Sequence, residues 1–195
     1  MPAAIGIIKD EHRSIAAVLH GLLYLVGEIR VGRMSPDFKL FTAMLHYIEA
    51  FPEKLHHPKE DEYLFRALRA RRPEAASVLD ALEAEHVRGR TLIEELATAL
   101  RQYETSGAAG FEAFAQAVQA YAEFHWAHMR QEEDVVLPMA EAALMAEDWQ
   151  AIDAAFQSHT DPIVGVPVSK EFRELFRRIV HLAPPPIGVG PAPSS

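Results

Sequence analysis

Two stretches of the chain repeat the same pattern of residues that bind metal ions. Residues 56–68 read HHPKEDEYLFRAL and residues 128–140 read HMRQEEDVVLPMA, and the two align without a gap. Each carries a histidine followed four residues later by a glutamate: His56 and Glu60 in the first stretch, His128 and Glu132 in the second. Because residues four apart lie on the same face of a helix, each pair can hold one metal ion.

An acid followed by a histidine lies upstream of each stretch. Glu11-His12 precedes the first stretch and Glu85-His86 precedes the second, so the chain is built from two similar halves. A helical bundle brings the inward faces of its helices together, which predicts a single shared metal site. The predicted ligands are His12, His56, Glu60, His86, His128 and Glu132.

This ligand set predicts two metal ions at one site. Two carboxylates can bridge the ions while two imidazoles bind each of them, and this leaves room for an exogenous molecule. Mixed nitrogen and oxygen ligands suit iron, with manganese as the other metal that accepts them. The chain contains no cysteine, which excludes a thiolate zinc site, an iron–sulfur cluster and disulfide bonds.

A proline complicates the first of the two stretches. Pro58 lies between His56 and Glu60, and proline kinks or breaks a regular helix. A kink or a single wide turn at this point would bring His57 inward. We expect His57 to act there either as a ligand or as a residue that orients the ligands, paired with Asp61.

Two further residues lie next to the predicted ligands of the second stretch. His125 is three residues before His128, and it either orients the ligands, lines the entry to the site or has a structural role. Glu133 follows Glu132 directly and aligns with Asp61. The additional candidates are therefore His57, Asp61, His125 and Glu133.

Composition limits the classes of partner. The 195 residues are enough for one sizeable core, and the formal charge of −9 argues against nucleic acid and against anionic membranes. No apolar run reaches the roughly 18 residues of a membrane span, and the N-terminus lacks the pattern of a secretory signal. We expect a cytoplasmic protein that binds neither nucleic acid nor membrane, and its oligomeric state stays open.

Helical periodicity extends over almost the whole chain. Apolar residues recur at spacings of three, four and seven, which predicts helices buried along one face. The predicted helices span residues 5–29, 36–71, 73–103 and 111–145. Ser35 is the predicted N-cap of the second helix, with Pro36 at its first position. Four long helices with short connections predict an all-α protein, an up-down-up-down four-helix bundle with one or two additional C-terminal helices.

The chain beyond the bundle divides into two parts. We expect a bundle domain over residues 1–145 and a C-terminal helical extension, packed on the bundle, over residues 146–182. The extension would contain an amphipathic helix from about 169 to 182. The tail, residues 183–195, is rich in Pro, Gly and Ser and is predicted to be disordered.

The motif resembles that of the hemerythrin-like HHE cation-binding domain family over residues 5–145. The resemblance rests on acid-His in the first and third helices and on His-x3-Glu followed by an aliphatic run in the second and fourth. It implies an up-down four-helix bundle around two non-haem iron ions, with Glu60 and Glu132 as bridging ligands. It also implies a protein that binds or reacts with O2, NO or peroxide as a sensor, scavenger or store.

The sequence departs from the oxygen-carrying hemerythrins at two places. Those proteins carry His-x3-His on the third helix, whereas here Arg90 lies four residues after His86. They also carry His-x4-Asp on the fourth helix, where this chain has Glu132 at four and Glu133 at five. The pattern is closer to hemerythrin-like proteins of iron–sulfur cluster repair, nitric oxide handling and iron or oxygen sensing, although the cysteine-bearing region of the repair proteins is missing.

Two other functions remain open on the residues alone. Ferritin-like di-iron oxidases use Glu-x-x-His on two helices, and Glu53 with His56 and Glu83 with His86 match this spacing, but the fourth helix lacks it. The other alternative is a non-catalytic interaction module whose contact surface is the amphipathic helix at 169–182. Whether the protein is an enzyme is therefore left open.

Overall fold

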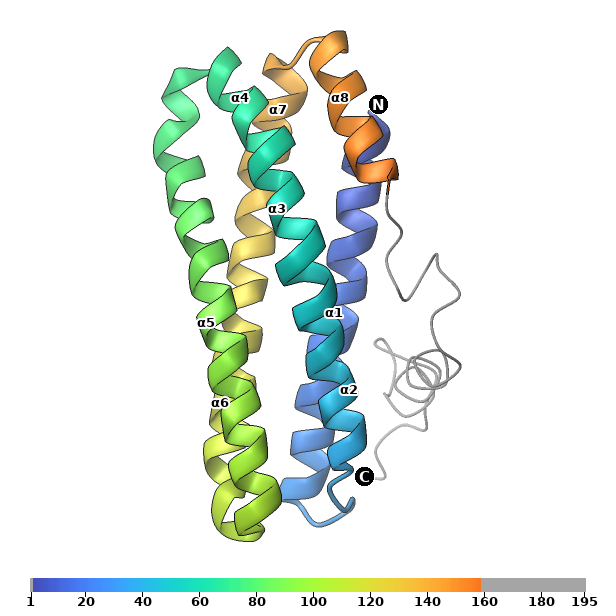
Figure 1. Ribbon diagram of the computed structural model, residues 1–195, viewed down its shortest axis with the longest axis vertical. Helices are drawn as coiled ribbons and strands as arrows, with labels where there is room; N and C mark the ends of the chain where they lie inside the picture. The colour runs from blue at the N-terminus through green and yellow to red at the C-terminus, as the bar shows by residue number, and fades with distance from the viewer. Residues whose placement is uncertain (1, 159–195) are drawn as a thin grey trace.

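Four long helices form an up-down-up-down bundle, and a shorter fifth helix lies at one end of it (Figure 1). The computed structural model describes residues 2–158. The first helix is α1 (Ala3–Arg30). The second is a continuous run of α2 (Phe38–Ile48), η1 (Glu49–His56), α3 (His57–Lys59), η2 (Glu60–Phe65) and α4 (Arg66–Arg71).

The second half of the chain repeats this arrangement. A short 3₁₀ turn, η3 (Pro73–Ala75), leads into α5 (Ala76–Ser106). The fourth helix consists of α6 (Ala108–Gln131), η4 (Glu132–Val136) and α7 (Leu137–Ala143), and it is followed by α8 (Ala146–Gln157). The predicted all-α bundle with additional C-terminal helix is confirmed, and residues 2–158 contain no strand.

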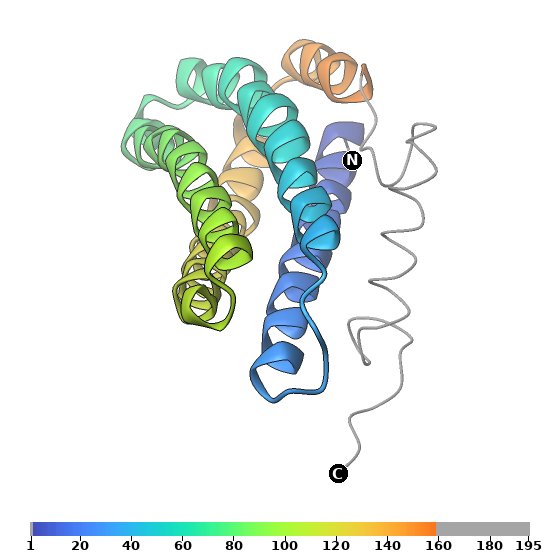
Figure 2. The ribbon, with the colours of Figure 1, turned by 60° about the horizontal axis from the view of Figure 1, so that its bottom comes forward.

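The connection between α5 and α6 is shorter than predicted. A single residue, Gly107, separates the two helices, and its φ of 60° lies in the left-handed region that glycine adopts without strain. The fourth helix therefore begins three residues before the predicted start at 111. The two helices lie side by side along most of their length (Figure 2).

The second helix begins later than the sequence predicted. Its N-cap is Asp37, not Ser35, because the backbone N–H of Leu40 donates to Asp37 Oδ1 at 3.0 Å. Aspartate and serine are comparable N-cap residues. Pro36 was therefore wrongly placed at the first helical position, since it precedes the cap.

Replacing this cap gives a test of the boundary. We expect Asp37→Ala to lower the free energy of unfolding by about 1 kcal/mol, because one N–H of the first turn loses its acceptor. Ser35→Ala is the matched control and leaves stability unchanged. Urea denaturation of both variants measures the difference, and equal loss in the two would contradict the assignment.

Pro52 and Pro58 do not interrupt the second helix. The helix continues through both residues because it widens into π-type turns in η1 and η2. A wide turn accommodates a residue that lacks an N–H and whose ring presses on the preceding turn of a regular helix. The fourth helix widens in the same way in η4, at the position that corresponds to η2 in the sequence repeat.

The apolar core is divided into two clusters along the bundle. One cluster is built from the middle and end of α1, from α2 and η1, and from the facing parts of α5 and α6. The other joins the start of α1, the end of the second helix, the start of α5 and the last turns of the fourth helix. Between them, at residues 11–14, 53–60, 86 and 125–132, lie most of the buried polar side chains.

The last described helix covers the end of the second cluster. Trp149, Ile152 and Phe156 of α8 are buried in this cluster with residues of α1, and α8 lies beside the start of α1 (Figure 1). The helix predicted at 169–182 and the tail at 183–195 lie outside the described residues. Within residues 2–158, the helices are all too short or too polar to cross a membrane.

Candidate metal centre

All six predicted ligands are buried at one level of the bundle. Each is at most 2% exposed. They come from all four long helices: His12 from α1, His56 and Glu60 from η1 and η2, His86 from α5, His128 from α6, and Glu132 from η4. Both glutamates are the first residue of a π-type segment, a helix form that often occurs at functional sites.

Three of these residues converge on the side of the bundle formed by the first two helices. The ligand atoms of His12, His56 and Glu60 all lie within 4.8 Å of one another, which is close enough to hold a metal ion. His56 Nε2 is 3.3 Å and His12 Nε2 is 3.8 Å from Glu60 Oε1. We refer to these three residues as the first group.

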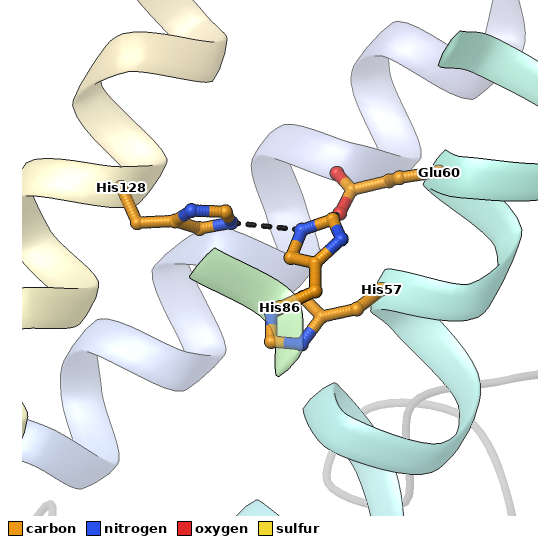
Figure 3. Close-up of side chains that lie close together, drawn as sticks. All are labelled: His57, Glu60, His86 and His128. Carbon is orange, nitrogen blue, oxygen red and sulfur yellow. Dashed lines mark hydrogen bonds and ion pairs between the residues drawn. The ribbon is translucent and has the colours of Figure 1, made fainter. Parts of the chain in front are cut away.

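A second group lies beside the first. It consists of His57, Glu60, His86 and His128, whose ligand atoms are also all within 4.8 Å of one another (Figure 3). The Nε2 atoms of His86 and His128 are 3.0 Å apart, a separation expected of two ligands that bind the same ion. Glu60 belongs to both groups, so one carboxylate joins them.

The second glutamate also spans the two groups. Glu132 Oε2 lies 3.2 Å from His12 Nε2, whereas its Oε1 lies 3.2 Å from His128 Nε2 and 3.6 Å from His86 Nε2. Glu60 divides its oxygens in the same way, with Oε2 3.6 Å from His86 Nε2. Each carboxylate thus turns one oxygen to each group, which is the arrangement of a bridging ligand.

The converging atoms have no hydrogen-bond partner within the described chain. The set comprises both oxygens of Glu60, both oxygens of Glu132, and the Nε2 atoms of His12 and His56. Leaving a buried polar atom without a partner costs about 1–3 kcal/mol, and more when the group is charged. Six such atoms in one place fit divalent metal ions, which would satisfy all of them.

The opposite nitrogen of each histidine is held by a carboxylate from a neighbouring helix. Nδ1 lies 2.7–2.9 Å from a carboxylate oxygen in the pairs His12–Glu133, His56–Glu11, His86–Asp61 and His128–Glu85. An ionised carboxylate only accepts hydrogen bonds, so Nδ1 donates. This interaction fixes the orientation of each ring, and on the neutral imidazole it leaves the lone pair on Nε2 for a metal.

These four carboxylates follow one another around the bundle. Glu11 of the first helix contacts His56 of the second, and Asp61 of the second helix contacts His86 of the third. Glu85 of the third helix contacts His128 of the fourth, and Glu133 of the fourth helix contacts His12 of the first. Sequence reasoning named Asp61 and Glu133 as candidates but gave Glu11 and Glu85 no role of their own. The available signal was their position, because each of the four is directly adjacent to a predicted ligand.

His57 is buried and faces the site, but its predicted pairing with Asp61 is wrong. Asp61 reaches across to His86 of α5 rather than back along its own helix. His57 Nδ1 instead lies 3.5 Å from Glu53 Oε2, one turn earlier in the same helix. His125 is buried as well, and its Nε2 lies 3.5 Å from Glu53 Oε1, so it lies beside the second group without belonging to it.

The metal-free site carries protons on several histidines. Burial lowers the pKa of His86, but the carboxylates of Asp61, Glu132 and Glu60 outweigh this and raise it to about 10. Burial also lowers the pKa of His128, and Glu132 and Glu85 raise it to about 9. The pKa of His12 is likewise raised well above its usual value, because Glu132, Glu133 and Glu60 outweigh its burial.

The pKa values of two other buried histidines, His57 and His125, shift in the opposite direction. Burial, together with the charges of His86 and His56, holds the pKa of His57 well below its usual value. Burial and the charge of His128 lower the pKa of His125 to about 3. Burial raises the pKa of Glu132, but His128, His12 and His86 outweigh it and hold that pKa well below the usual range.

Fold and site together define a class of protein: a helical bundle whose buried histidines and glutamates can hold metal ions. A family model described as the Hemerythrin HHE cation binding domain matches residues 3–140. The chain therefore belongs to the hemerythrin HHE cation-binding family. Comparisons with curated proteins and with solved structures found no match.

Proposed function

We propose that this protein holds two non-haem iron ions and binds or reacts with O2, NO or peroxide as a sensor, scavenger or store. The observation that carries the proposal is the division of Glu60 and Glu132 between two groups of histidines. One carboxylate that touches one group would fit a single ion. Two carboxylates that each turn one oxygen to each group fit two neighbouring ions.

The proposed ligand set follows the two groups. His12 and His56 would bind one ion, His86 and His128 the other, and the two glutamates would bridge them. Nitrogen and oxygen donors without sulfur suit iron, and they also accept manganese. The ring of carboxylates behind the histidines supports this set, because partners of this kind orient metal-binding imidazoles and increase their basicity.

Iron ions bound here would supply electrons and an open coordination position for a small molecule. The residues of the chain contribute binding, orientation and exclusion of water. Apolar clusters lie on both sides of the polar layer along the bundle, and they separate it from solvent at the two ends. The fully buried Phe156 of α8 packs near His56, with ring centroids 6.4 Å apart.

The ferritin-like alternative receives no support from the geometry. Its third-helix motif would need Glu83 as a ligand, but Glu83 accepts a hydrogen bond from Arg69 at 2.8 Å instead. Its second-helix motif would need Glu53 to bind alongside His56, and Glu53 lies beside His57 and His125. The interaction-module alternative rests on the helix predicted at 169–182, outside the described residues.

The proposal is tested by loading the full chain with ferrous iron under anaerobic conditions. We expect two irons per chain by metal analysis, and a visible absorption spectrum that changes on exposure to air or to NO. Such a response would also indicate which of the two gases the site binds. A chain that retains no stoichiometric iron after desalting would contradict the proposal, and manganese loading under the same conditions tests the other metal.

A further inference from the structure

A buried polar cluster lies behind the second group, outside the six proposed ligands. Its centre is Glu53, which is 3% exposed. The Tyr121 hydroxyl donates to Glu53 Oε1 at 3.0 Å, and His125 Nε2 lies 3.5 Å from the same oxygen. His57 Nδ1 lies 3.5 Å from Glu53 Oε2. The carboxylate is thus held between α6 on one side and the ring of His57 on the other.

Like the two metal groups, this cluster contains buried polar atoms that have no hydrogen-bond partner within residues 2–158. Glu53 Oε2, His57 Nδ1 and His125 Nε2 are all buried without a hydrogen-bond partner among the described residues. Their separations of 3.5 Å are at the outer limit of a hydrogen bond. A small movement of the Glu53 carboxylate is enough to shorten the contact with His57 to the 2.7–2.9 Å of the other four carboxylate–histidine pairs.

The ring of His57 faces the second group. It stacks on His86 with ring centroids 4.3 Å apart and an angle of 11° between the planes. One of its nitrogens lies within 4.8 Å of the ligand atoms of Glu60, His86 and His128. Figure 3 places the ring of His57 next to that of His86, below Glu60.

The wide turns of the second helix explain how two consecutive histidines both reach the site. In a regular α-helix, neighbouring residues point about 100° apart, so the two rings would not be directed at the same point. Here His56 ends the π-type segment η1 and is part of the first group, whereas His57 begins α3 and is part of the second. The second helix therefore supplies one imidazole to each group.

We propose that His57 is a third imidazole on the metal position of the second group, and that Glu53 is the residue that positions it. With a metal bound, His57 Nδ1 would donate to Glu53 Oε2, which leaves Nε2 of that ring for the metal. The two positions are then unequal, with two imidazoles on the first and three on the second. This inference rests on the proposed function, because it requires two metal ions at the shared site.

A glycine on α5 makes room for the positioning residue. A Cβ atom added at Gly89 would lie 3.0 Å from Glu53 Oε1 and 3.3 Å from Oε2. An alanine there would shift the carboxylate by a few tenths of an ångström without removing any polar group. Gly89→Ala therefore shifts the Glu53 carboxylate slightly while every histidine, every glutamate and Tyr121 remains present in the chain.

The inference is tested by Mössbauer spectroscopy of the full chain loaded with iron-57. We expect two quadrupole doublets of equal area from the wild-type protein, one for each iron. In His57→Ala the doublet of the second position changes, and millimolar free imidazole restores it by occupying the vacated place. His20→Ala is the matched control, because His20 is half-buried against Trp126, with ring centroids 4.6 Å apart, and belongs to neither ligand group; it leaves both doublets unchanged.

The role of Glu53 is tested by iron affinity in the same series. Residues that orient a ligand typically contribute about 10–100-fold to metal affinity, so we expect Glu53→Ala to weaken the binding of one of the two irons by that factor. Glu53→Gln recovers most of the affinity, because an amide oxygen still accepts from Nδ1–H. Gly89→Ala shows a smaller change at the same iron position, because it shifts the carboxylate without removing it.

The outcomes separate this inference from the proposed function. Two irons in the wild-type protein, with doublets and affinities that are the same in His57→Ala and Glu53→Ala, would overturn the inference and leave the proposed function intact. A wild-type chain that binds no iron would overturn both. Selective loss at one position, with recovery by imidazole and by Glu53→Gln, would support both.

Discussion

Replacing Glu60 with alanine is expected to remove both metal ions from the chain. Glu60 belongs to both ligand groups, and it is fully buried. Its loss deprives each group of a charged oxygen. The remaining imidazoles come from four separate helices, so the packing of these helices fixes the distances between the imidazoles. We expect iron content to fall from two per chain to below one after desalting.

Thermal unfolding provides a second measure of the same loss. A metal present at 100 times its dissociation constant stabilises the folded chain by about 2.7 kcal/mol, so metal addition should raise the melting temperature of the wild-type protein. The Glu60→Ala protein should show no such increase. Glu62→Ala is the matched control, because Glu62 lies two residues away in η2 and is exposed. Full iron retention in Glu60→Ala would refute the bridging assignment.

The second large effect is a steep dependence of metal affinity on pH. Three histidines of the metal-free site have a raised pKa, with His86 at about 10 and His128 at about 9. At neutral pH a metal must therefore displace protons from these rings. We expect the release of about three protons per chain when both ions bind, so that the overall constant for binding the two ions rises on the order of 1000-fold for each unit of pH near neutrality.

The proton count can be measured directly. Isothermal titration calorimetry in two buffers of different ionisation enthalpy gives the number of protons released on metal binding. Replacing the exposed His46 of α2 with alanine is the control and leaves this number unchanged. Metal binding without proton release at pH 7 would show that the histidines are neutral in the metal-free protein.

Without metal, the same groups make folding depend on pH. A histidine whose pKa is raised above its usual 6.5 stabilises the folded chain below that pH, and this stabilisation is lost as the pH rises through about 9 and 10. A glutamate whose pKa is lowered, such as Glu132, stabilises the folded chain at pH values above 4.5, its usual pKa. This stabilisation is lost as the pH falls below 4.5. His57 and His125, whose pKa values are lowered, act in the opposite direction, because the folded chain is destabilised as the pH falls below 6.5. Denaturation of the metal-free protein should therefore show highest stability near pH 6.5.

Much of the fold was predictable because helical periodicity is a local property. Spacings of three and four residues place apolar side chains on one face whatever the helix packs against, and this is why four long helices were correctly predicted. The start of the second helix was missed because Ser35 and Asp37 are both good caps. Only the hydrogen bond from Leu40 distinguishes them.

The two prolines show a different limit. The sequence signals that Pro52 and Pro58 disturb the second helix, but it does not specify the form of the disturbance. The packing of the bundle keeps the chain helical on both sides, so the strain is relieved by wide turns rather than by a break. His56 and His57 consequently reach the two neighbouring ligand groups, one each.

The sequence by itself determined the all-α bundle, the two-fold repeat, and which histidines and glutamates are spaced to face a common interior. The tertiary structure alone decided which atoms meet across helices: the carboxylates behind each histidine, the pairing of Asp61 with His86 and the approach of Glu53 to His57. The reason is physical. Residue spacing along one helix follows from local geometry, whereas a contact between helices depends on how they pack, their relative register and the exact width of each turn.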